Sequence, residues 1–157
     1  MGRYIAPTGN PVIKRLDTSR SSTTTLASDP ELSIPAQANS LYIVKAIILW
    51  DGQGSTTNGI KIKVNVPSGS IRSMFYLANT NTSVGSVGSN SAPTSILNTI
   101  GSFEVLPSVS GAQDVIVIDG VIQTVNAGNI TIQWAQSSSS VTVTKVGGYS
   151  SFSLVKV

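Results

Sequence analysis

The chain has 157 residues, of which 40% are hydrophobic and only 11% are charged, far below the charged share of about a quarter that is usual for globular domains. This length allows one domain with a substantial core. The absence of cysteine excludes disulfides, thiol chemistry and cysteine-ligated zinc, and the absence of histidine removes the usual general base and the commonest metal ligand.

The net charge of +3 is located in the first twenty residues. There, four basic residues outnumber one acidic residue: Arg3, Lys14, Arg15 and Arg20 against Asp17. Beyond them, acidic and basic residues cancel. Nucleic-acid binding would require a basic face interleaved with aromatic residues, and no segment has the apolar length of a membrane span. We therefore expect neither a nucleic acid nor a membrane as a partner.

Residues 1–22 are predicted to form an extended N-terminal arm. Pro7, Gly9 and Pro11 oppose a regular helix or a central strand. The interleaving of apolar and basic residues favours a segment that becomes ordered on a partner protein, with a disordered terminus as the alternative. Eight residues are predicted to make this contact: Arg3, Tyr4, Ile5, Val12, Ile13, Lys14, Arg15 and Arg20.

Residues 23–157 are predicted to form a single all-β domain, an antiparallel β-sandwich. A short edge strand is expected around Leu32 and Ile34, and a core strand, apolar on both faces, at 41–50. Residues 60–66 alternate apolar and polar side chains with the period of a half-buried strand. Further strands are predicted at 71–77, 101–106, 141–146 and 149–157, with a long polar loop at 79–98.

The clearest strand signal lies between residues 114 and 136. Residues 115–118 are an unbroken run of β-branched side chains, which pack well on a pleated surface. Residues 126–129 (Asn-Ala-Gly-Asn) tolerate a chain reversal, and 130–136 alternate again. The pattern predicts a long antiparallel hairpin at the centre of the domain.

Two of these predicted strands are apolar on both faces. A sandwich core covers one face, and either the chain's own loops or a second subunit must cover the other. The sequence leaves both possibilities open. If a subunit provides the cover, four residues are candidates for its interface: Tyr42, Val44, Val115 and Val117.

The sequence contains no recognisable catalytic pattern. It has no glycine-rich phosphate loop, and its seven acidic residues are dispersed. The two close pairs, Asp29 with Glu31 and Asp114 with Asp119, are interpreted as turn and strand-end residues. We therefore expect a protein that is not an enzyme and that uses no catalytic residue, cofactor or metal.

Several segments resemble small virion proteins of tailed bacteriophages. In that group a QWAQ element ends one strand and a turn similar to GSYL opens the last one; here Gly147-Gly-Tyr-Ser150 stands at the turn. The resemblance covers about residues 26–157. Its segments are Leu26-Ala-Ser-Asp-Pro-Glu-Leu-Ser-Ile-Pro35, Asn39-Ser-Leu-Tyr-Ile-Val44, Gly59-Ile-Lys-Ile-Lys-Val-Asn65, Gly128-Asn-Ile-Thr-Ile-Gln-Trp-Ala-Gln136 with Ser137–Ser140, Val143-Thr-Lys-Val146 and Gly148-Tyr-Ser-Ser-Phe152.

This resemblance implies a jelly roll of the TNF or C1q type that forms a homotrimer. It further implies a capsid decoration (cement) protein, made in the host cytoplasm and seated on the major capsid protein lattice at the virion surface, with the arm as attachment. The alternative is a tail-fibre, head-fibre or baseplate module that recognises a host glycan or surface protein. Its sugar-stacking candidates are Trp50, Tyr76 and Tyr149, for which core packing is the competing interpretation.

Overall fold

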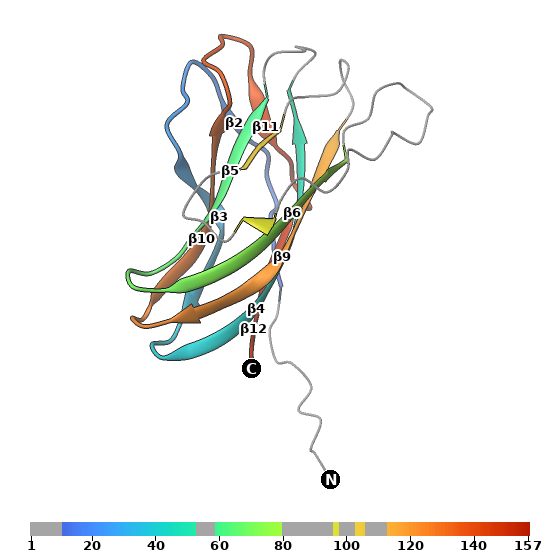
Figure 1. Cartoon of the computed structure of the whole chain (residues 1–157). Coiled ribbons are helices and arrows are strands. Elements are labelled where there is room, and N and C mark those ends of the chain that lie inside the picture. The colour runs from blue at the N-terminus through green and yellow to red at the C-terminus, as the bar shows by residue number, and fades with distance from the viewer. Residues whose placement is uncertain (1–10, 53–58, 80–95, 98–102, 106–112) are drawn as a thin grey trace.

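The computed structural model describes residues 11–52, 59–79, 96–97, 103–105 and 113–157. All regular elements within these ranges are β-strands, so the predicted all-β class is confirmed. They form two antiparallel sheets that face each other (Figure 1). Within the same ranges, no helix is long and apolar enough to cross a membrane.

The larger sheet has eight strands in the described part of the chain, and it is strongly curled (Figure 1). Its main order is β12 (Ser151–Lys156), β4 (Ser40–Asp51), β9 (Asp114–Thr124), β6 (Ile71–Asn79) and β7 (Ile96–Leu97). Three short strands extend it: β1 (Val12–Ile13) beside β12, β11 (Thr144–Val146) beside β4, and β2 (Thr18–Arg20) beside β11.

The smaller sheet has four strands in the described residues. Their order is β3 (Ala27–Ala36), β10 (Gly128–Gln136), β5 (Ile60–Asn65) and β8 (Phe103–Val105). β3 lies at the edge, which explains how it continues through Pro30 and Pro35. A proline lacks the N–H that a central strand must donate, but an edge strand tolerates its absence.

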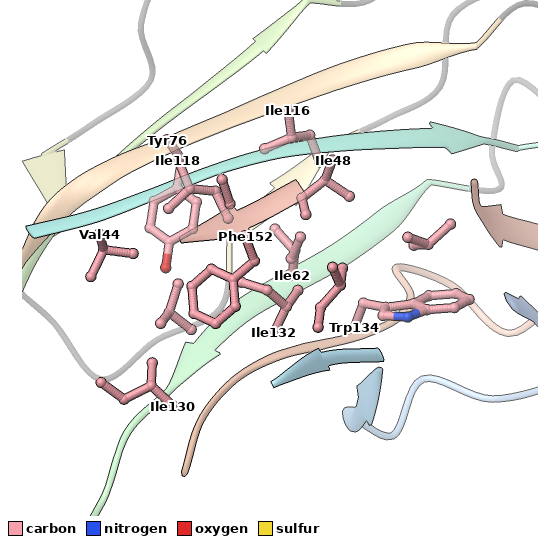
Figure 2. Close-up of a cluster of buried hydrophobic side chains, with 14 of the residues drawn as sticks. Val44, Ile48, Ile62, Tyr76, Ile116, Ile118, Ile130, Ile132, Trp134 and Phe152 are labelled. Carbon is pink, nitrogen blue, oxygen red and sulfur yellow. The ribbon is translucent and has the colours of Figure 1, made fainter. Parts of the chain in front are cut away.

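The hydrophobic core lies between the two sheets. The alternation predicted for 60–66 is confirmed over β5, because Ile60, Ile62 and Val64 are fully buried there. Figure 2 shows how side chains from both sheets meet: Val44, Ile48, Tyr76, Ile116, Ile118 and Phe152 from the larger sheet, and Ile62, Ile130, Ile132 and Trp134 from the smaller one.

The hairpin predicted across residues 126–129 is wrong. β9 pairs with β4 and β6 in the larger sheet, whereas β10 pairs with β3 and β5 in the smaller one. The turn therefore carries the chain from one sheet to the other. Turn residues allow a reversal, but they do not determine whether the next strand pairs with the previous one or faces it across the core. Here the apolar sides of β9 and β10 face each other.

Two smaller expectations are also modified. The strand predicted at 141–146 begins only at Thr144. Within the predicted loop 79–98, Ile96 and Leu97 form β7 and pair with β6. Residues 80–95 of that loop lie outside the described residues.

Candidate functional site

Residues 11–20, the second half of the predicted arm, lie in the body of the protein. β1 pairs with β12 and β2 pairs with β11. The boundary predicted at residue 22 therefore does not separate an arm from a domain in this part of the chain. The predicted contact residues Arg3, Tyr4 and Ile5 lie outside the described residues.

Lys14, which the sequence assigned to a partner contact, is fully buried in the protein itself. Its Nζ donates to Oδ1 of Asp29 at 2.9 Å and to Oγ1 of Thr18 at 2.6 Å, and it lies 3.5 Å from Oε1 of Glu31. The Asp29 side chain is fully buried as well. A buried ammonium group needs such a carboxylate, because an unpaired charge would be strongly destabilising. This side chain is not available to a partner.

The Asp29 carboxylate accepts further hydrogen bonds from donors on two strands, β3 and β10. Its Oδ1 accepts hydrogen bonds from the backbone N–H groups of Glu31 at 3.0 Å and Leu32 at 3.3 Å, and its Oδ2 accepts one from Nε1 of Trp134 at 3.1 Å. The bonds to the N–H groups two and three residues on are those of a turn-type aspartate, as predicted, and Asp29 in addition binds Lys14 and Trp134. It is an internal junction that joins β3, β10 and the segment between β1 and β2.

Glu31 holds the backbone of that same segment. Its carboxylate accepts the N–H groups of Arg15 at 2.9 Å and Leu16 at 3.2 Å, besides its contact with Lys14. The hydrogen bond from Arg15 is the main cause that lowers the pKa of Glu31; burial opposes it, and Leu16 and Lys14 reinforce it. Glu31 is therefore held in its carboxylate form.

Arg20 completes this group of contacts. Its guanidinium lies over the Trp134 ring, 4.1 Å from the centroid, and donates to the carbonyls of Ala27, Ser28 and Trp134. Burial lowers the pKa of Arg20, and Asp29 opposes that effect. We call Lys14, Arg20, Asp29, Glu31 and Trp134 the N-terminal clasp, because together they fasten residues 14–20 to the smaller sheet.

The remaining contact candidates of the described segment are less enclosed. Ile13 is 47% exposed, Arg15 is exposed and Val12 is half-buried. Ile13 pairs with Ser151, which in turn pairs with Ile47 of β4. The predicted set is thus divided, with Lys14 and Arg20 satisfied internally and Ile13 and Arg15 at the surface.

The outward side of the larger sheet carries several exposed apolar side chains, which lie on both sides of one charged pair. The strand register places Ile43 opposite Val121 and Ile47 opposite Val117. Ile43 is 37% exposed, Val121 43% and Ile47 48%. We call this set the outer apolar face, and its further members are Leu41, Leu49, Val115 and Val155.

One charged pair interrupts the outer apolar face. Nζ of Lys45 lies 3.7 Å from Oδ2 of Asp119, and both side chains are more than half exposed. The two residues are directly opposite each other on β4 and β9. A surface pair of this kind contributes only about 0–1 kcal/mol, but it neutralises its own charges. The pair consequently adds no net charge to the outer apolar face.

The four predicted interface residues fall on opposite sides of the sheet. Val115 and Val117 belong to the outer apolar face, whereas Tyr42 and Val44 are buried in the core. The assignment of Tyr42 and Val44 to an interface is wrong, because residues of β4 alternate strictly and the even-numbered ones point inward. Ile43 and Ile47 were not among the predicted interface residues, although the same alternation identifies them once one inward residue of β4 is known.

The aromatic residues considered for sugar stacking are also separated. Trp50 is fully buried and Tyr76 is 3% exposed, whereas Tyr149 is 84% exposed. Tyr149 has a positive φ of 68°. Its N–H donates to the carbonyl of Lys14 at 2.7 Å, and the N–H of Gly148 donates to Oδ1 of Asp17 at 2.9 Å. Core packing removes Trp50 and Tyr76 from consideration, and Tyr149 remains on a well-fixed turn.

Among the described residues, no group of three or more histidine, cysteine, aspartate or glutamate side chains could hold a metal ion. Comparison of the chain with known protein families, with curated proteins and with solved structures finds no match. The class that is established is therefore an all-β protein with two antiparallel sheets.

Proposed function

We propose that this protein is a jelly-roll structural protein that forms a homotrimer and decorates the capsid surface of a bacteriophage. The strand order supports the jelly roll. From β3 to β10, the first, eighth, third and sixth strands form one sheet, and the second, seventh, fourth and fifth form the core of the other. Eight strands wound as two Greek keys produce this order.

The outer apolar face supports self-association, and it is the observation that carries the proposal. Single exposed hydrophobic residues are ordinary, but several exposed apolar side chains grouped on one sheet face are typical of an interaction surface. Because Lys45 and Asp119 neutralise each other, a second copy can cover the apolar residues around them without burying an unpaired charge. Closed symmetry is the usual outcome for identical subunits.

The capsid as partner rests on the sequence resemblance together with the basic N-terminus. Arg3, Tyr4 and Ile5 keep their proposed role in attachment to the major capsid protein, and Arg15 extends the same basic segment at the surface. Lys14 and Arg20 are removed from this role by the N-terminal clasp. A short attachment segment on each of three subunits would bind a symmetric lattice with increased avidity.

The test combines light scattering after size exclusion with co-sedimentation on undecorated capsids. We expect a trimer for the full chain and for a chain of residues 11–157, and capsid binding for the full chain alone. The truncation stops before residue 11 because deletion to residue 20 would remove β1, β2 and Lys14. A monomer that ignores capsids overturns the proposal, and unimpaired binding by residues 11–157 overturns the role of the first ten residues.

Tyr149 supports a second candidate, a module that binds a host glycan. A large aromatic side chain held in a rare backbone conformation is typical of a site where geometry is fixed for recognition, and Tyr149 is 84% exposed. Binding of the protein to a glycan array, lost in Tyr149→Ala, would favour this candidate. Absence of binding by the intact protein would remove it.

A further inference from the structure

Three side chains of the N-terminal clasp carry chemistry that a trimeric coat protein does not require. Lys14 is a primary amine, Asp29 is a carboxylate that can serve as an acyl donor, and Glu31 is a second carboxylate within reach of the same Nζ. We propose that Lys14 and Asp29 become joined by an intramolecular isopeptide bond, with Glu31 as the residue that transfers the proton. This inference does not depend on the proposed function.

The first requirement, proximity, is met by the fold. Nζ of Lys14 lies 2.9 Å from Oδ1 of Asp29, so the amine is in direct hydrogen-bond contact with the carboxyl group whose Cγ it would attack, and such preset proximity favours reaction. Both residues are fixed on either side of the bond. Lys14 donates its backbone N–H to the carbonyl of Ser150 at 2.8 Å, and Asp29 lies within β3. The reaction is therefore intramolecular between groups that already touch.

The second requirement is that the nitrogen presents its reactive side to the carboxyl group. An ammonium group has three donor positions. Two of them are directed at Oγ1 of Thr18 at 2.6 Å and at Oε1 of Glu31 at 3.5 Å, so the third faces Asp29. Glu31 is thus placed to accept a proton from Nζ.

The third requirement is that the reaction removes two charges that burial has separated from water. The side chains of Lys14 and Asp29 are both 0% exposed, and a charged pair in such a site has lost its hydration. Transfer of one proton from the ammonium to the carboxylate gives a neutral amine and a carboxylic acid without any net charge in the core. Amide formation then removes both buried charges permanently.

The fourth requirement is stabilisation of the charge that develops on the carboxyl oxygens. Three N–H groups point at these oxygens: those of Glu31 and Leu32 at Oδ1, and Nε1 of Trp134 at Oδ2. Donors fixed in advance around a developing oxyanion are the arrangement that accelerates acyl transfer. After the reaction, the N–H donors at the oxygen that remains would bind the amide oxygen.

The atoms balance without any external reagent. Nζ of Lys14 forms a bond to Cγ of Asp29, and one C–O bond of the carboxyl group breaks. The oxygen leaves as water, carrying two protons that both originate from the ammonium, one of them passed through Glu31, which ends unchanged. An ammonium and a carboxylate become a secondary amide and one water. Glu31 is partly exposed, with 29% of its side chain accessible, so the released water has a route out.

The protein contains an internal comparison for this chemistry. Lys45 and Asp119 also form an ion pair, but both are more than half exposed and their charged atoms are 3.7 Å apart. In the described part of the chain, Lys45 is paired with the single carboxylate of Asp119, whereas Lys14 contacts two carboxylates. Exposed amines and carboxylates remain hydrated and charged, so Lys45 and Asp119 are expected to stay unlinked.

The test is the intact mass of the purified full chain after denaturation. We expect a mass lower than that of the sequence by one water, and a branched peptide after proteolysis that joins Lys14 to Asp29. Succinimide formation also removes water, but not at Asp29, because the following Pro30 has no N–H. A folded wild-type protein with the full sequence mass overturns the proposal.

Three variants make the assignment specific. Lys14→Arg keeps the charge but should restore the full mass, and Asp29→Asn should lose one ammonia in place of water. Glu31→Gln should fold, as checked by circular dichroism, yet keep its full mass. Loss of water that persists in Lys14→Arg overturns the bond, and loss of water in Glu31→Gln overturns the role of Glu31. The branched peptide of the wild type decides the question without reliance on the folding of any variant.

Discussion

Replacement of Ile47 by lysine should dissociate the oligomer while leaving the subunit folded. Ile47 is 48% exposed at the centre of the outer apolar face. Full burial of an isoleucine contributes about 1.5–3 kcal/mol, so completing its burial in an interface contributes about 1 kcal/mol. A lysine there loses that contribution and adds the desolvation of a charge, about 2 kcal/mol or more. About 3 kcal/mol per subunit corresponds to roughly a hundredfold in the association constant.

Light scattering over a dilution series measures this change, and urea unfolding reports the stability of the subunit. The matched control is Val141→Lys, because Val141 is 87% exposed and lies in a turn outside the sheet. The control should keep the wild-type mass at every concentration. Equal dissociation of both variants, an Ile47→Lys protein that stays associated, or a wild-type protein that is monomeric throughout would each refute the reasoning.

Three further predictions concern the stability of the subunit. Ile132→Ala should lower the free energy of unfolding by about 2–5 kcal/mol, because the fully buried side chain leaves a cavity between the sheets; a smaller loss in urea unfolding would contradict this packing. Tyr149→Gly should be more stable than Tyr149→Ala by about 1 kcal/mol, because glycine adopts the φ of 68° without a steric penalty; equal urea midpoints would count against it. Since the pKa of Glu31 is lowered, its stabilisation is complete above the ordinary value of 4.5 and is lost as the pH falls through the lower pKa of the folded protein. Glu31→Gln should flatten this part of the acid dependence, and an unchanged pH profile would contradict the role of its hydrogen bonds.

The local character of the strands could be predicted from the sequence, because it depends on neighbouring residues. Alternation identified the inward residues of β5, and β-branched runs located β4 and β9. Pairing could not be predicted in the same way. The turn at 126–129 is equally compatible with a hairpin and with a crossing between sheets, and only contacts with β3, β4, β5 and β6 decide between them.

The N-terminal clasp was beyond sequence reasoning for a related reason. A single lysine in a basic segment indicates a solvated side chain, and Lys14 has no local feature that predicts its burial. The one sequence feature that could have indicated a buried cation was the pair of carboxylates Asp29 and Glu31 on either side of Pro30. Turn chemistry explains that pair equally well. Both carboxylates contact Lys14, and Lys14 reaches them only because β1 and β2, on either side of it, pair with the larger sheet.

The crossing of the chain between sheets has a consequence for how the protein reaches its native state. β4 pairs with β9 and β12, so Ile43 pairs with residues that come much later in the chain, Val121 and Val155. From β3 to β6, consecutive strands belong to different sheets and therefore cannot form hairpins. Such non-local pairing makes folding slow, because loops must close before the contacts that reward closure exist. During synthesis, the apolar strand β4 leaves the ribosome long before its partner strands β9 and β12. We therefore expect β4 to be the main segment that a chaperone binds before folding is complete.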